Sequence, residues 1–282
     1  MSATWQGAPA PAAARITPLG WLRVVLRGSA LGAVTFGGLA LLLVVRLVER
    51  PLYGLHRPVT PYITQGVCRA AFVILGIAHR TEGTPMAQPG AVVANHASWL
   101  DIFALNARKR IYYVAKSEVA GWAGIGWLAR ATGTVFIARD RAQAAAQKQV
   151  FEDRLTAGHK LLFFPEGTST DGRRVLPFKP TLFEAFFAPA LKERIFVQPV
   201  SVVYTAPRGQ DARFYGWWGD MDFAPHLLKV LAAPCQGEVF LTYHPPLRVA
   251  DFSGRKSLCA ACEIAVRGGH TARLSRSRPP AP

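Results

Sequence analysis

Two signatures of well-known protein classes are missing from the sequence: a cysteine framework and a nucleophile elbow. Only four cysteines occur in 282 residues, and the close pair Cys259 and Cys262 has no second cysteine or histidine pair to complete a metal site. This usage excludes a disulfide framework, argues against structural zinc, and places the main domain in a reducing compartment. The chain also has no G-x-S-x-G motif, which argues against a serine hydrolase of that kind.

Acidic residues are scarce as well. The chain has 17 Asp and Glu against 33 Lys and Arg, which gives a formal net charge of +16 and predicts an anionic partner. The basic residues are dispersed, and no basic run with interleaved aromatic residues is present, so we expect no nucleic-acid partner. Because half of the residues are hydrophobic, a membrane surface is the favoured anionic partner.

One long uncharged run lies near the start of the chain. Residues 28–45 would extend for roughly 27 Å as a helix, just short of the ~30 Å hydrocarbon core of a bilayer. Charged residues follow the run in place of a cleavage site, which argues against a signal peptide. We expect an N-terminal membrane helix here, with a buried core helix as the alternative. A shorter run over residues 66–78, interrupted by Arg69, predicts a second, interfacial or re-entrant helix.

Strand-like and helix-like runs alternate from Gly90 onwards. The strand-like runs are residues 91–95, 111–116, 134–139, 160–164, 195–204 and 238–244, and the helix-like runs start at Trp99 and Trp122 and cover 141–155 and 180–191. This alternation predicts an α/β domain with a largely parallel sheet flanked by helices. We expect a flexible tail over residues 1–20, membrane-anchoring helices over 21–80, the α/β domain over 81–250, and a C-terminal helix with a disordered basic tail over 251–282.

The first strand of this domain is followed by the polar sequence NHASWLD, residues 95–101. Sites in parallel sheets gather at the carboxyl ends of strands. A carboxylate one turn into a helix can reach an imidazole at the helix start, so Asp101 would orient His96 and stabilise its imidazolium form. His96 would then be a general base, and because no protein nucleophile accompanies it, the substrate would supply the attacking hydroxyl. The alternative is a structural histidine at a helix start.

A second polar patch, LFFPEGTSTDGRRVLPFK, covers residues 162–179. Its strand ends at Phe164, and Gly167 would let backbone amides approach a ligand closely. Lys179, Arg173 and Arg174 could hold a phosphate or a carboxylate. The alternative for this patch alone is an ordinary surface loop.

Taken in order, these patches resemble the phospholipid/glycerol acyltransferase family, typified by 1-acylglycerol-3-phosphate acyltransferases. The family motif N-H-x-S-x-x-D corresponds to Asn95, His96, Ser98 and Asp101; F-I-x-R to Phe136, Ile137 and Arg139; F-P-E-G-T to residues 164–168; and a proline between apolar residues to Pro199. The resemblance covers about residues 67–250. The four motifs together are far more specific than any one of them.

The resemblance implies direct transfer of an acyl chain from a thioester to a lysolipid hydroxyl, with His96 and Asp101 as the catalytic pair. The implied substrate-binding residues are Asn95, Ser98, Arg139, Glu166, Gly167, Thr168 and Lys179. Backbone amides near Gly167 are the candidates for the oxyanion site. No metal or bound cofactor is expected, since acyl-carrier protein or acyl-coenzyme A would be consumed as the donor. The implied location is the inner or plasma membrane of a bacterium, with the catalytic domain on the cytoplasmic side.

One position departs from the family pattern. Many lysophosphatidate acyltransferases continue the third motif as F-P-E-G-T-R, whereas this chain has Ser169 in place of that arginine. The stretches FPEGTSTDGRRVLPFK and WWGDMDFAPHLL look more like the lyso-ornithine lipid acyltransferase branch, whose acceptor has no phosphate. We therefore expect 1-acylglycerol-3-phosphate as the main acceptor and lyso-ornithine lipid as the alternative. A remote third possibility is a membrane-bound binding protein without activity.

Overall fold

The computed structural model describes residues 5–7, 9, 11, 15–122, 124–137 and 144–276. Its strands are β1 (Ala78–Glu82), β2 (Gly90–Ala94), β3 (Tyr112–Lys116), β4 (Val135–Ile137), β5 (Leu161–Phe163), β6 (Phe196–Thr205), β7 (Glu238–Tyr243) and β8 (Leu247–Arg248). Its α-helices are α1 (Pro18–Tyr53), α2 (Thr60–Leu75), α3 (Leu100–Arg108), α4 (Ile125–Thr132), α5 (Ala144–Thr156), α6 (Pro189–Lys192), α7 (Phe223–Ala232) and α8 (Arg255–Arg276). Short 3₁₀ helices are η1 (Ser117–Gly121), η3 (Pro180–Phe187) and η4 (Val249–Asp251).

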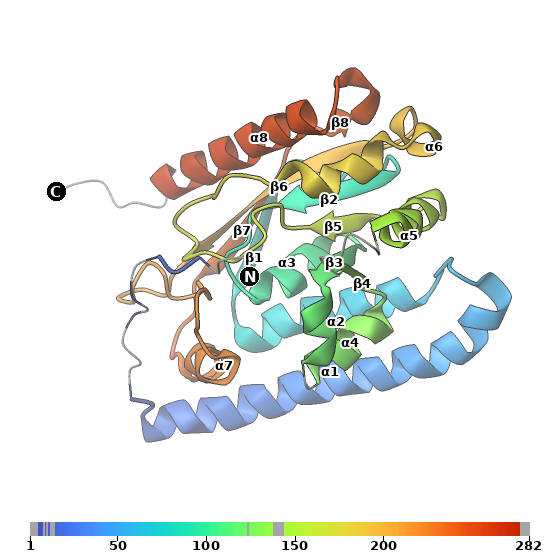
Figure 1. The fold of residues 1–282 in the computed structure, drawn as a ribbon. Coiled ribbons are helices and arrows are strands. Elements are labelled where there is room, and N and C mark those ends of the chain that lie inside the picture. The colour runs from blue at the N-terminus through green and yellow to red at the C-terminus, as the bar shows by residue number, and fades with distance from the viewer. Residues whose placement is uncertain are drawn as a thin grey trace.

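The strands form one sheet in the order β1-β7-β6-β2-β5-β3-β4, with β8 paired to β6. Five pairings are parallel, and β6 pairs antiparallel with β7 and β8. Figure 1 shows the sheet in the middle of the molecule, with α1 and α2 along one side and α8 along the other. The predicted α/β class with a largely parallel sheet is confirmed.

Apolar cores cover both faces of the sheet. Successive side chains of a strand point to opposite faces. Val92 and Ala94 of β2 accordingly join the core under α2, α3 and α7, whereas Ala91 and Val93 join the core under α5, η3 and α8. All five residues of β2 are buried, which explains why the sequence shows a continuous apolar run here.

Helix α1 is longer than the uncharged run that predicts it. Its 36 residues begin at Pro18, where the Thr17 hydroxyl accepts the Gly20 N–H at 3.1 Å, and end before Gly54, whose φ of 57° stops the helix. At 1.5 Å per residue this is roughly 54 Å. Among the described residues, α1 is the one helix that is long and apolar enough to cross a membrane.

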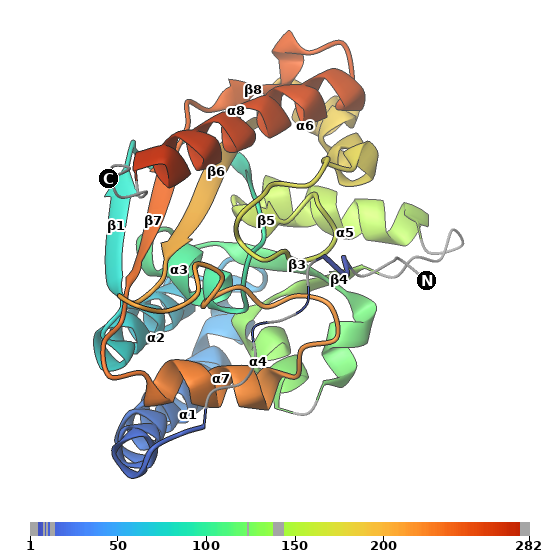
Figure 2. The same cartoon turned by 90° about the vertical axis from the view of Figure 1, so that its left-hand side faces the viewer.

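One side of α1 packs against α2 and α7, and Figure 2 shows α7 beside α1. The other side carries exposed apolar side chains: Leu22, Val25, Leu26, Phe36, Leu41, Val44, Leu47, Val48 and Leu52. Exposed apolar surface of this extent is typical of a membrane contact. The apolar helix therefore indicates that the protein associates with a membrane.

Two secondary-structure predictions require correction. The expected interfacial helix over residues 66–78 ends at Leu75, and Ala78 starts β1, an edge strand that the short polar sequence AHRTE does not announce. The single helix expected over 180–191 is divided into η3 and α6, because Pro189 disfavours helical backbone at the residue before it and lacks an N–H.

The ends of the described chain also differ from the expected tails. Residues 18–20 belong to α1, and the Trp5 ring packs on the Trp218 ring at 6.2 Å. The disordered basic tail expected after the C-terminal helix is wrong as far as Arg276, since α8 continues to that residue. His270 is buried there, and the Arg273 guanidinium contacts Glu238 at 2.8 Å.

Candidate active site

The loop after β2 carries His96 and is fixed by buried polar contacts on both sides. The Asn95 side chain, fully buried, donates to Val202 O at 2.9 Å and accepts from Val202 N at 2.8 Å, which ties this loop to β6. The His96 carbonyl accepts the Thr170 N–H at 2.9 Å. Asn95 is therefore a positioning residue whose amide is used by the backbone, and the structure does not place it in the substrate cavity.

His96 and Asp101 lie together as predicted. The His96 Nδ1–H donates to Asp101 Oδ2 at 2.7 Å, and the same oxygen accepts the N–H groups of Ala97 (2.8 Å) and Ser98 (3.0 Å). Because α3 begins at Leu100, the Asp101 carboxylate folds back over the helix start, where the helix dipole favours negative charge. This arrangement fixes the Nδ1–H tautomer and leaves His96 Nε2 for a substrate proton.

The second oxygen of Asp101 has a partner that the sequence analysis misses. The Tyr204 hydroxyl at the end of β6 donates to Asp101 Oδ1 at 2.8 Å. Burial, together with the Asp101 carboxylate, raises the pKa of Tyr204, so its hydroxyl remains a donor. The position of Tyr204 in the sequence could have revealed this contact. Tyr204 ends the apolar run that contains Pro199, and this run ends at the edge of the sheet where His96 lies.

Glu166 proves to be a positioning residue too. Its side chain is 1% exposed; Oε1 accepts the His96 N–H and Oε2 accepts the Leu176 N–H, both at 2.7 Å. Burial raises the pKa of Glu166 to about 8, although these two N–H groups act in the opposite direction. Both carboxylate oxygens of Glu166 are thus bonded to backbone amides, and its expected role in binding the acceptor stays a prediction.

The turn after β5 lies against the histidine. The Phe164 ring stacks on the His96 ring with centroids 4.0 Å apart, which fixes the plane of the imidazole. Gly167 has a φ of +73°, a backbone conformation that residues with a side chain rarely adopt. A Cβ here would lie 2.9 Å from Lys179 Nζ, so the end of the lysine side chain would have to shift. The Gly167 N–H donates to Phe164 O at 3.0 Å and is used in the turn itself.

A large cavity of about 1960 Å³ opens at this edge of the sheet. His96, Gly167, Thr168 and Lys179 line it, whereas Asn95, Ser98 and Glu166 do not. Its apolar part is lined by α1, α2, α3 and α4, including Leu31, Leu39, Val67, Phe103 and Leu128. The cavity thus joins an apolar space large enough for lipid chains to the His96 imidazole.

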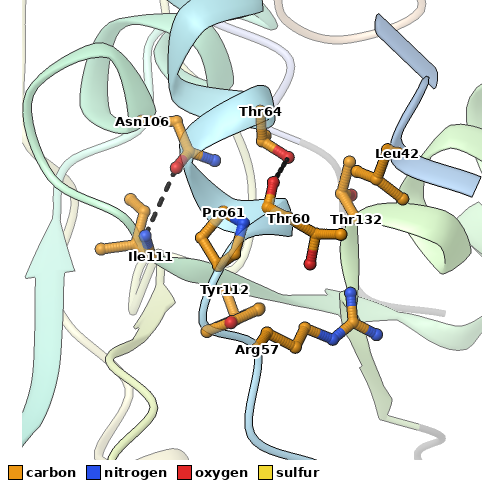
Figure 3. Close-up of a pocket in the computed structure, with 9 residues that line it drawn as sticks. All are labelled: Leu42, Arg57, Thr60, Pro61, Thr64, Asn106, Ile111, Tyr112 and Thr132. Carbon is orange, nitrogen blue, oxygen red and sulfur yellow. Dashed lines mark hydrogen bonds between the residues drawn. The ribbon is translucent and has the colours of Figure 1, made fainter. Parts of the chain in front are cut away.

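A second cavity lies near the start of β3 (Figure 3) and has a volume of about 10 Å³. Arg57, Pro61 and Tyr112 line it, and Figure 3 shows the Asn106 carboxamide accepting the Ile111 N–H beside it. A space of this size holds at most one water molecule. The large cavity is therefore the candidate substrate site.

Two remaining predicted residues complete the comparison with the sequence. Ser98 is fully buried, and its hydroxyl accepts the Leu100 N–H at 3.3 Å at the start of α3, so it positions the loop and does not face the cavity. Arg139 lies outside the described residues. Within the described chain, no group of three or more His, Cys, Asp or Glu side chains is arranged to hold a metal ion.

Comparisons with known proteins show the family of this chain. The acyltransferase family model matches residues 77–203, which include His96, Asp101 and Glu166. The lyso-ornithine lipid O-acyltransferase of Rhodobacter capsulatus is 58% identical over 265 residues, covering 94% of this chain and 96% of that protein. This chain belongs to the acyltransferase family. It is an acyltransferase whose relatives are named as lysolipid O-acyltransferases.

The acyltransferase also resembles a solved structure and further relatives. The lyso-ornithine lipid O-acyltransferase of Brucella abortus is 37% identical over 66% of this chain and 71% of that protein. The 1-acyl-sn-glycerol-3-phosphate acyltransferase of Neisseria gonorrhoeae is 39% identical over only 33% of this chain and 37% of its own. PlsC from Thermotoga maritima, an LPA acyltransferase, shares the fold with a TM-score of 0.65 at 22% identity, covering 90% of this chain and 96% of that one. The longer matches favour the alternative acceptor of the sequence analysis over the main one.

Proposed function

We propose that the acyltransferase is a lyso-ornithine lipid O-acyltransferase, which moves an acyl chain from a thioester to the free hydroxyl of a lyso-ornithine lipid. The observation that carries the proposal is the 58% identity with the Rhodobacter capsulatus enzyme over 94% of the chain. Ser169 supports it, because this neutral residue lines the cavity where many phosphate-using relatives have an arginine. Formation of phosphatidic acid from 1-acylglycerol-3-phosphate is the competing proposal.

The chemistry needs one base and one acceptor hydroxyl. His96 Nε2 takes the hydroxyl proton as the acceptor oxygen attacks the thioester carbon. Asp101 stabilises the resulting imidazolium through the 2.7 Å bond to Nδ1. The tetrahedral intermediate then collapses, the carbon–sulfur bond breaks, and the imidazolium returns the proton to the departing thiolate. The products are the ester of the lipid and a free thiol.

The oxyanion of the intermediate needs hydrogen-bond donors near the attacked carbon. We assign this role to the backbone amides of Thr168 and Ser169, which line the cavity after the Gly167 turn. The Gly167 amide itself is committed to Phe164 O. The side chains of Thr168 and Lys179 then remain for the acceptor head group.

Both proposed donors, acyl-carrier protein and acyl-coenzyme A, are anionic, which suits the net charge of +16. These donors occur in the cytoplasm, so we propose that the catalytic domain lies on the cytoplasmic side of the membrane. The acyl chains of both substrates would enter the apolar part of the cavity beside α1.

The experiment is acyl transfer by the purified protein, with lyso-ornithine lipid and lysophosphatidate offered side by side with one acyl thioester. We expect kcat/KM to be higher for lyso-ornithine lipid. A higher kcat/KM for lysophosphatidate would overturn the proposal in favour of the competing one. His96→Ala serves as the control for transfer that does not depend on the site.

A further inference from the structure

The loop between β6 and α7 lies beside the catalytic histidine. The Trp217 N–H donates to Ala97 O at 2.9 Å, so this loop is bonded to the residue that follows His96. The Trp217 indole N–H donates to Met221 O at 2.8 Å, which folds the loop back on itself. Three residues of chain span at most ~11 Å, so Asp220 stays close to Trp217. Both residues line the cavity that contains His96.

The charged groups on the described cavity wall are of both signs: Lys116, Lys179, Glu184, Asp220 and Arg255. Glu184 and Arg255 neutralise each other in an ion pair at 2.6 Å. Asp220 belongs to none of the ion pairs found among the described residues, and neither does Lys179. Lys116, on the same wall, has interactions of its own. Asp220 and Lys179 therefore offer a carboxylate and an ammonium group to a ligand that carries both charges.

The N-terminal segment shows which groups these wall residues accept. The Gln6 side-chain N–H donates to Asp220 Oδ2 at 3.3 Å, and the adjacent Trp5 backbone N–H donates to Thr168 Oγ1 at 3.4 Å. Trp5 and Gln6, which are consecutive, thus bridge Thr168 and Asp220. A small head group in the same place could likewise contact both wall residues at once. The Gln6 amide is a neutral donor on Asp220, and a cationic N–H donor would bind the carboxylate more strongly.

The charges also distinguish between acceptors. A zwitterionic ornithine head group, whose α-amine is acylated, carries a carboxylate and a free side-chain amine. Asp220 would attract this amine, whereas it would repel a phosphate. Lys179 can hold either anion, so it contributes affinity without choosing between the two acceptors.

We propose that Asp220 determines acceptor specificity by binding the free amine of the head group, while Lys179 binds its carboxylate. The inference rests on the proposed function, because it takes lyso-ornithine lipid as the acceptor. It adds to that function a residue outside the four family motifs, in the WWGDMDF stretch at residues 217–223.

The test uses Asp220→Asn and two acceptors, lyso-ornithine lipid and an analogue with norvaline in place of ornithine. The analogue keeps the carbon chain, the carboxylate and the hydroxyl but has a methyl group where ornithine has its aminomethyl group. A charge-assisted hydrogen bond corresponds to about a tenfold or greater ratio of kcat/KM. We expect the wild type to prefer the ornithine lipid by about this factor and Asp220→Asn to lose the preference while using the analogue normally.

Asp222→Asn is the matched control. Asp222 lies two residues further on and is exposed, as Asp220 is, but it does not line the cavity and makes no side-chain cap bond at the start of α7. This variant should keep the wild-type preference. An equal preference in wild type and Asp220→Asn, or no preference in the wild type, would overturn the role of Asp220 while leaving the proposed function in place. A wild type that acylates lysophosphatidate but not lyso-ornithine lipid would instead overturn the proposed function.

Discussion

The Tyr204 hydroxyl donates a hydrogen bond to Asp101 Oδ1 at 2.8 Å, and so joins the end of β6 to the start of α3. With His96 Nδ1 and the amides of Ala97 and Ser98, the carboxylate accepts four hydrogen bonds. Four donors around one fully buried carboxylate fix its direction. The histidine is thus oriented by contacts from two segments far apart in the sequence.

Replacing Asp101 with asparagine should lower kcat by ~10²-fold or more, because an amide cannot stabilise the imidazolium. Tyr204→Phe removes only one neutral hydroxyl donor, and we expect a loss of about tenfold or less. The measurement is thiol release under saturating acceptor. Equal losses in the two variants would show that Asp101 acts through packing and not through its charge.

Removing the base itself should be equally severe. His96→Ala should lower turnover by ~10²-fold or more with either acceptor, since it removes the group that takes the hydroxyl proton. The side chain is only partly buried at 19% exposed, so the fold should remain intact. Circular dichroism provides the control, and near-normal turnover in a folded variant would contradict the mechanism.

Position 169 should shift the choice of acceptor. Ser169→Arg adds a cation to the cavity wall, which should help lysophosphatidate and repel the free amine of lyso-ornithine lipid. We expect the ratio of kcat/KM for lyso-ornithine lipid over lysophosphatidate to fall by about tenfold. Ser169→Gln, long but neutral, controls for bulk. An unchanged ratio would place residue 169 outside the head-group region.

Acid should destabilise the protein through His226. The Trp99 indole N–H donates to His226 Nδ1 at 3.0 Å, and burial lowers the pKa of His226 to about 3. The unfolded chain, with a pKa near 6.5, binds this proton first, so the free energy of unfolding falls as pH drops from about 6.5 towards 3. Between pH 7 and pH 4.5 the wild type should lose about 2–3 kcal/mol more than His226→Gln, whose side-chain oxygen can still accept from Trp99. Urea unfolding in detergent at the two pH values measures this, and equal losses would refute it.

The α1 helix should hold the protein on membranes after a wash in high salt. Salt screens charge attraction within a few ångströms, whereas burial of the exposed leucines and valines of α1 persists. Sedimentation of washed membranes, with detection of the protein in pellet and supernatant, is the measurement. Full release into the supernatant would mean that basic surface charge alone accounts for the attachment.

Much of the architecture could be predicted because its signals are local. The buried runs that became β2, β5 and β6 are continuous and apolar, and they place the motifs at one edge of the sheet. β1 could not be predicted in this way, because its alternating, half-exposed pattern is short and polar. The same limit applies to the end of α8, where basic residues suggest a disordered tail although His270 is buried beneath them.

The site shows a similar division. The contact between His96 and Asp101 could be predicted from their spacing, since both residues lie within one turn of the same helix start. The spacing alone left a structural histidine as the alternative, and the four ordered motifs together favoured the catalytic interpretation. The contacts of Glu166 could not be predicted, because a motif does not show which way a carboxylate points. Its partners are the backbone amides of His96 and Leu176. Almost every residue has such an amide, so the sequence does not show which amides bind the carboxylate.

The apolar part of the cavity is walled by α1, whose opposite side carries exposed apolar side chains. A lipid acceptor can therefore move from the membrane to His96 along apolar side chains and need not enter the aqueous phase. The enzyme then encounters lysolipid by diffusion within the plane of the membrane. The rate accordingly depends on the mole fraction of lysolipid in the membrane and not on its molar concentration in the whole sample. Diluting the membrane with inert lipid should slow the enzyme, whereas adding buffer should not.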